Sequence, residues 1–202
     1  MASQVQICNL ALSHLGQSGI QSLGEASAAA EHCSLAWGPA LEAALRDHNW
    51  NFATRYQALA SLGGPPPHWR WRYAAPADLV RARFLLPVRK GDPTPAFEIA
   101  LADDGATRIV LTDAAQAWLC YTGLIANTSL YDALFVDALA WRLAADLAAP
   151  LTQSDRRHQV CLNRYQGALA GAKGADAAEG GIPHDALPGW IAARGIAPAG
   201  PG

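Results

Sequence analysis

The spacing of apolar side chains changes twice along this chain of 202 residues, and that change limits the folds it can adopt. Near the start, Ile7, Ala11 and Leu15 recur every four residues, as on one face of an α-helix. In the middle, aromatic residues alternate with arginines over 69–73, which is the period of a β-strand. Helical spacing returns from about residue 130. The pattern therefore predicts helices, then strands, then helices again.

The apolar pattern predicts four helices. Gly38 and Pro39 interrupt the second, and because proline removes a backbone donor we expect a kink or a break there. The third is apolar almost all round, so it should be the central helix, buried on several sides. The expected ranges are 4–15, 28–48, 130–148 and from about 155 onward.

Polar residues beside these segments mark the expected helix ends. Ser3 and Gln6 have the spacing of a capping box. Ser129 is the expected cap of the third helix, which should end before Pro150. Thr152 is the expected cap of the fourth.

Alternation of apolar and polar residues predicts strands in the middle of the chain. Asp103, Asp104 and Gly105 form a turn signal between two of them, so those two strands should pair as a hairpin. The expected strands are 69–73, 80–84, 96–102, 107–112 and 118–122.

The expected fold class is α+β and mainly α. Residues 1–50 and 127–179 should form the body, an antiparallel helical bundle. Residues 51–126 should be a small antiparallel β insertion. Residues 180–202 are rich in glycine and proline and are expected to be an extended arm.

Charge and cysteine usage exclude several classes of protein. The net charge is −2, which argues against a general nucleic-acid binder. Four cysteines lie far apart without a CxxC pair, so they are expected to be small buried residues in a reducing compartment. The N-terminus lacks the pattern of a secretory signal. Four charges within 130–149 argue against a membrane span there.

The common sequence signatures of catalysis are missing. The chain contains no G-x-S-x-G, P-loop, G-x-G-x-x-G or H-E-x-x-H motif. No histidine has another at i+3 or i+4, as a helical metal site would need. We therefore expect no enzyme, no catalytic residue, no cofactor and no metal, although residues distant in sequence could still assemble a site.

The segment 55–90 is unusually basic. It holds seven basic residues and one acidic residue, a net +6, so the remainder of the −2 chain carries −8. Arginines alternating with aromatic residues can bind nucleic acid, and they can also be the solvent face of a strand. A basic face meeting an acidic one also suits contact between identical subunits. The interface candidates are Arg70, Arg72, Arg81 and Arg83.

The arm 180–202 carries large apolar residues that a free linker would not need. Trp190 and Ile191 are further interface candidates, because a tryptophan can bury a large area in a partner groove. We expect the arm to dock on a neighbouring subunit or another partner, and the alternative is that it folds back on its own domain.

Several segments resemble phage head–tail adaptor proteins of the tail tubular protein A family. The opening ICNLALSHLGQSGIQSLGE is similar to the family's short helix, Leu-Gly and loop. The run 121–152 resembles its strand exit and long central helix, and 73–78 resembles its Tyr-x-x-Pro-x-Asp step. The segment LEAALRDHNWNFATRYQAL resembles its Arg-x-x-x-Trp-x-Phe-Ala-x-x-Arg pattern, carried here by Arg46, Trp50, Phe52, Ala53 and Arg55.

This resemblance covers about residues 4–179 and implies a structural role. It implies a homo-oligomeric, twelve-fold ring beneath the portal protein, with double-stranded DNA passing through the centre without sequence-specific binding. The ring would be a platform for a tail or nozzle protein, made in the host cytoplasm and located in the virion, with no membrane partner. Pro39 and the arm 180–202 depart from the family pattern. The alternatives are a helical nucleic-acid-binding protein that uses 55–90, and an enzyme with a spatially assembled site.

Overall fold

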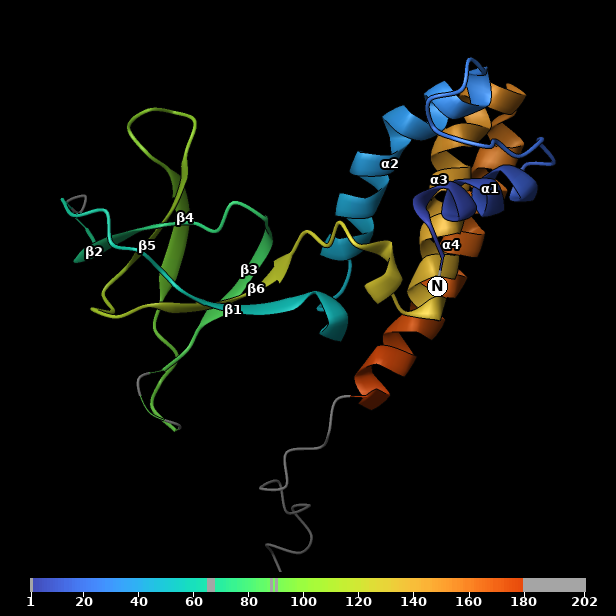
Figure 1. Ribbon diagram of the computed structural model, residues 1–202. Helices are drawn as coiled ribbons and strands as arrows, with labels where there is room; N and C mark the ends of the chain where they lie inside the picture. Colours follow the sequence, from blue (N-terminus) through green and yellow to red (C-terminus); the bar gives the residue numbers. More distant parts are fainter. Residues whose placement is uncertain (1, 65–67, 88, 90, 180–202) are drawn as a thin grey trace, which may run out of the picture.

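The computed structural model describes residues 2–64, 68–87, 89 and 91–179. Within those residues the fold is α+β, with helices on one side of the molecule and strands on the other (Figure 1). The helices are α1 (Gln4–His14), α2 (Ala28–Arg46), α3 (Ala133–Thr152) and α4 (Asp155–Glu179). The strands are β1 (Thr54–Ala58), β2 (Trp71–Ala74), β3 (Leu79–Leu85), β4 (Phe97–Leu101), β5 (Arg108–Thr112) and β6 (Trp118–Gly123).

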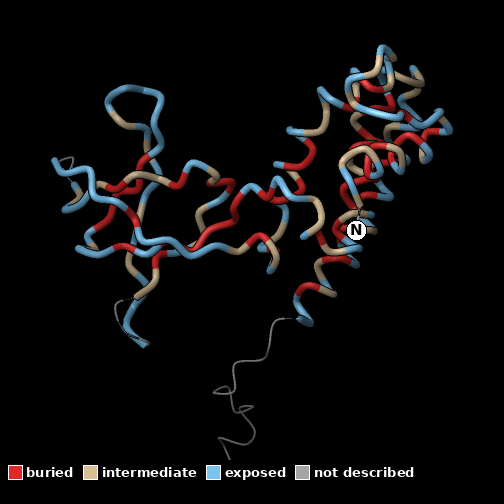
Figure 2. The backbone as a smooth tube through the Cα atoms, in the orientation of Figure 1, coloured by how far each residue is buried: buried red, intermediate tan, exposed pale blue. Residues whose placement is uncertain are grey.

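Helix α3 packs against all three other helices, as its nearly uniform apolar pattern predicts. Figure 2 shows buried residues on all four helices, and together these residues form one hydrophobic core. The four cysteines are free and buried, as expected, and contribute to packing rather than to disulfides. Fully buried members of the core include Ile7, Leu12, Leu45, Trp50, Phe135, Leu139 and Leu143.

The capping box at α1 is confirmed, but the expected caps of the last two helices are wrong. Helix α3 begins later than expected because Asp132, not Ser129, accepts hydrogen bonds from the first turn. The Thr152 hydroxyl donates back to a carbonyl of α3. Ser154 accepts from the Arg157 backbone N–H at the start of α4.

Two prolines, Pro39 and Pro150, each lie inside a helix. Helix α2 continues through Pro39 without a break. Pro39 lacks the N–H that would bond the Leu35 carbonyl, and Leu35 is exposed, so water can bond that carbonyl. Pro150 lies in the last turn of α3 instead of after it. That helix ends at Gln153, which is left-handed at φ 51° and donates its N–H to the Ala149 carbonyl.

The strands form two antiparallel sheets of three strands each. The strand order is β1-β6-β3 in one, here called sheet A, and β2-β5-β4 in the other, sheet B. The hairpin expected at Asp103 to Gly105 is confirmed, since β4 pairs with β5 and Gly105 adopts φ 67°. Strand β1 was not predicted. Both sheets contribute to a second hydrophobic cluster that includes Tyr73, Leu79, Leu85, Val110, Leu119 and Tyr121.

The imidazole of His14 lies against the Trp141 indole, with ring centroids 3.6 Å apart and planes 3° apart. Burial lowers the pKa of His14 below its usual 6.5, and the nearby charge of Asp137 opposes this shift. As pH falls below 6.5, the unfolded chain binds a proton that folded His14 resists. The free energy of unfolding should therefore decrease with falling pH, until His14 is protonated in both states.

We expect the variant His14→Gln to lose part of this acid sensitivity. Urea unfolding of both proteins between pH 8 and pH 5 measures how the free energy of unfolding depends on pH. The contribution of the other histidines is the same in both proteins and drops out of the comparison. Equal slopes for the two proteins over that interval would contradict the assignment to His14.

Candidate interaction site

The outer face of sheet A carries three large aromatic side chains. Tyr56 on β1 and Phe84 on β3 both lie opposite Cys120 of β6. Paired residues point to the same face, as do residues two apart, so Trp118 joins them. Tyr56 is 58% exposed, Phe84 40% and Trp118 50%. We call Tyr56, Phe84 and Trp118 the aromatic face.

The buried thiol of Cys120 lies between Tyr56 and Phe84 on the central strand β6. Burial raises the pKa of this thiol, so it stays protonated at neutral pH. The opposite face of the sheet contributes Leu85, Leu119 and Tyr121 to the cluster shared with sheet B. Sheet A therefore has one face in a core and one aromatic face in solvent, which leaves the second available for a partner.

Arg83 lies beside the aromatic face but bonds inward. Its guanidinium donates to the hydroxyls of Thr54 and Thr122 at 2.8 Å and to the Trp50 carbonyl at 3.2 Å. Burial lowers the pKa of Arg83, yet arginine remains charged at neutral pH. This side chain therefore ties sheet A to the helices and leaves few donors for a partner.

Other arginines fasten the end of α2 to the strands. Arg46 donates to the Val80 carbonyl at 2.6 Å, and Arg81 donates to the Arg46 carbonyl at 3.2 Å. Arg108 donates to the Leu79 carbonyl at 2.6 Å. The Arg46 and Arg81 contacts therefore hold α2 to sheet A, and the Arg108 contact holds sheet B to sheet A.

The four arginine candidates are divided between the two sheets. Arg72 is on β2 of sheet B and Arg70 precedes it, whereas Arg81 and Arg83 are on β3 of sheet A. Arg72 pairs with Asp103 at 3.3 Å. The other two candidates, Trp190 and Ile191, lie outside the described residues.

A polar cluster fastens α4 to the segment after α2. The Asp176 carboxylate lies 2.9 Å from His48 Nε2 and accepts from the Asn51 backbone N–H at 2.9 Å. The Asn51 side chain donates to the Asp176 carbonyl at 2.7 Å. A His–Asp pair can orient a nucleophile, but in the described part of the chain no hydroxyl or thiol bonds to His48. The contacts of this cluster hold α4 to the segment between α2 and β1.

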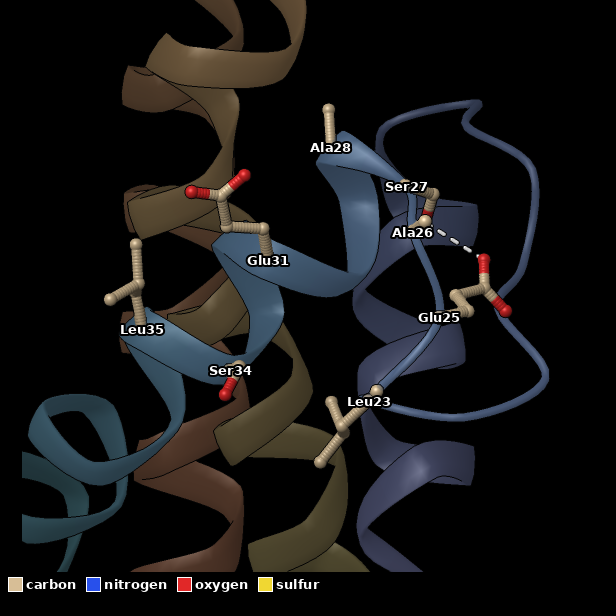
Figure 3. Close-up of a pocket in the computed structure, with 9 residues that line it drawn as sticks. Leu23, Glu25, Ala26, Ser27, Ala28, Glu31, Ser34 and Leu35 are labelled. Atoms are coloured by element: carbon tan, nitrogen blue, oxygen red, sulfur yellow. Dashed lines mark hydrogen bonds between the residues drawn. The ribbon is translucent and has the colours of Figure 1, made fainter.

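A hollow lies beside the loop before α2 and its first turns (Figure 3). Glu25 is its most constrained group. Its carboxylate accepts from the Gln21 N–H at 2.7 Å and from the Ser27 hydroxyl at 2.8 Å. The Gln21 N–H and the Ser27 hydroxyl hold the pKa of Glu25 below its usual value. These bonds stabilise the loop before α2.

Among the residues described, no three His, Cys, Asp or Glu side chains gather as metal ligands. No helix in the described ranges is long and apolar enough to cross a membrane.

Comparisons with known proteins identify no relative: no protein-family model matches the chain, and no curated protein matches it either. A function has to be inferred from the residues and their geometry.

Proposed function

We propose that this chain is the subunit of a phage head–tail adaptor, in which an antiparallel helical bundle with a β projection assembles into a ring. The ring, of about twelve copies as the resemblance implies, would lie between portal and tail in the virion and surround the DNA path. The observation that carries the proposal is the aromatic face, Tyr56, Phe84 and Trp118, left exposed on a folded sheet.

An exposed aromatic face of this kind favours a protein partner. Tyrosine and tryptophan dominate the energy of protein interfaces, because they bury a large area at low entropic cost. Three such side chains on one sheet face are a concentrated apolar patch on a chain with only 16% charged residues.

The partner proposed for this face is a second copy of the chain. The segment 55–90 contributes β1, β2 and β3 and carries a net +6, while the remainder carries −8. The basic segment of one copy can therefore meet an acidic surface of the next. A repeated head-to-tail contact between unlike surfaces closes into a ring when the rotation permits.

The role of DNA in this proposal is passage, not recognition. Arg55 pairs with Asp78 at 2.8 Å and Arg72 with Asp103, while Arg83 bonds inward. These contacts occupy part of the basic segment that a nucleic-acid-binding protein would present to phosphates. A net charge of −2 suits a channel wall past which DNA slides.

The test compares assembly of the parent with a Tyr56→Ser/Trp118→Glu variant. Tyrosines and tryptophans that anchor an interface each contribute about 2 kcal/mol or more, so the loss of both should raise the concentration for half-assembly roughly thousandfold. Mass photometry and electron microscopy, with and without the portal protein, measure the ring. The melting temperature of the monomer should change little, since both side chains are exposed.

The matched control is Leu35→Glu on α2, where the leucine is 67% exposed and away from sheet A. It should assemble like the parent. A parent chain that stays monomeric with the portal present, and instead binds DNA in a salt-dependent way, would support the nucleic-acid alternative and contradict the adaptor.

A further inference from the structure

A second surface lies on the helices, where the end of α1 meets α3 and α4. It is a pocket of about 700 Å³. Trp141 from α3 and Val160 and Cys161 from α4 supply apolar parts of its lining. Three arginines of α4 also line it, and no carboxylate does: Arg156, Arg157 and Arg164. We call this surface the arginine pocket.

The three arginines of this pocket lie close together, and no Asp or Glu side chain is among its lining residues. Arg157 donates to the Leu15 carbonyl at 2.8 Å, which fixes its position. Within the described ranges, none of the three arginines forms an ion pair. Arg157 and Arg164 are seven residues apart, so they lie on one side of α4. Like charges held together in this way favour an anionic occupant.

A nitrogen in the same lining lacks a partner. His14 Nε2 is buried and has no hydrogen bond within the described chain. A buried polar atom left unpaired destabilises a protein, and a polar occupant of the pocket can remove that cost.

The turn between β4 and β5, in the other half of the chain, has the opposite charge to the arginine pocket. Leu101 is 60% exposed at its edge, and the Asp103 side chain is fully exposed. The Asp104 carboxylate accepts hydrogen bonds from the backbone N–H groups of Ala106 and Thr107 and from the Thr107 hydroxyl, at 2.6 to 2.8 Å. These bonds lower the pKa of Asp104 to about 2. The turn is thus an acidic, preorganised tip with an exposed leucine.

The acidic tip and the arginine pocket lie on opposite sides of α2. Figure 1 shows the β4–β5 turn among the strands, and α1 and α4 beyond α2. Because α2 lies between them, the tip and the pocket of one chain do not contact each other. They are placed for contact between successive copies.

We propose that the β4–β5 tip of one copy inserts into the arginine pocket of the next. Leu101 packs on Trp141 and Val160, and Asp103 lies between Arg156 and Arg164. The ion pair that Asp103 must leave, with Arg72 at 3.3 Å, is exposed and therefore weak. This contact rests on the proposed assembly of identical subunits and names the residues that set its direction.

Charge reversal on each side tests the contact in the full-length protein. We expect Asp103→Arg alone, and Arg156→Glu/Arg164→Glu alone, each to raise the concentration for half-assembly roughly tenfold or more. The chain that combines all three changes should recover most of the parent's assembly, because the charges are exchanged. Glu42→Arg and Gln166→Glu are matched controls at exposed positions and should assemble like the parent.

The outcomes separate this inference from the proposed function. Rings that form equally well in the parent and in both reversed variants overturn the tip-and-pocket contact and leave the adaptor proposal standing. Weakened assembly without recovery in the combined variant also overturns the contact. Recovery in an oligomer that is not a ring supports the contact and contradicts the adaptor. A parent that never self-associates contradicts both.

Discussion

We expect Leu139→Asp to remove the cooperative unfolding transition of the helices. Leu139 has no exposed surface and lies in α3, which packs against α1, α2 and α4. An aspartate there would be an unpaired carboxyl group in an apolar core, at a cost of about 4 kcal/mol or more. Domains are commonly stable by only about 5–15 kcal/mol, so the loss is a large fraction of the total. Circular dichroism during heating measures it.

The matched control for that substitution is Leu134→Asp in the first turn of α3. Leu134 is 45% exposed, so the new carboxylate stays in water and near the positive end of the helix dipole. Its melting temperature should stay close to that of the parent. A Leu139→Asp protein that melts like the parent would contradict the central position of α3.

The helices were predictable because their apolar residues follow the helical period. Their ends were less so, because several polar residues compete as caps. Asn127 accepts from Ser129 in a short 3₁₀ helix, and Asp132 then caps α3 two residues before Leu134. Serine and aspartate both cap helices well, so residue type alone does not show that Asp132 rather than Ser129 caps α3.

The strands show where period-two reasoning fails. Strand β3 has irregular pairing between Leu79 and Arg81 and again between Ala82 and Phe84. A bulge of this kind shifts the alternation of side chains. Phe84 is consequently exposed while Arg83 bonds inward, the reverse of an aromatic face in the core and arginines in water.

The residues of the two candidate surfaces are brought together by strand pairing and helix packing. Tyr56 lies in β1, a strand that the alternation did not predict, and it shares a face with Phe84 because both strands pair with β6. The arginine pocket combines residues from α1, α3 and α4. Such groupings follow from tertiary packing, so no short sequence pattern contains them.

Loss of the Asp176 carboxylate should be the second large effect on stability. Asp176 is only 9% exposed, and its side chain satisfies both His48 and the Asn51 N–H. Asp176→Ala leaves those groups without a partner and frees the end of α4 from the segment that leads into β1. An unsatisfied buried donor costs about 1–3 kcal/mol, and because His48 and Asn51 are only partly buried we expect about 2 kcal/mol for the two together.

Two further variants separate the lost hydrogen bonds from a general effect on α4. Asp176→Asn keeps an oxygen that can accept from Asn51, so it should cost less than Asp176→Ala, about 1 kcal/mol. Glu179→Ala removes an exposed carboxylate one turn later and should be neutral within about 0.5 kcal/mol. Urea unfolding at constant pH ranks the three. Equal losses for alanine and asparagine at 176 would show that the Asn51 bond contributes nothing, and that the charge beside His48 alone fastens α4.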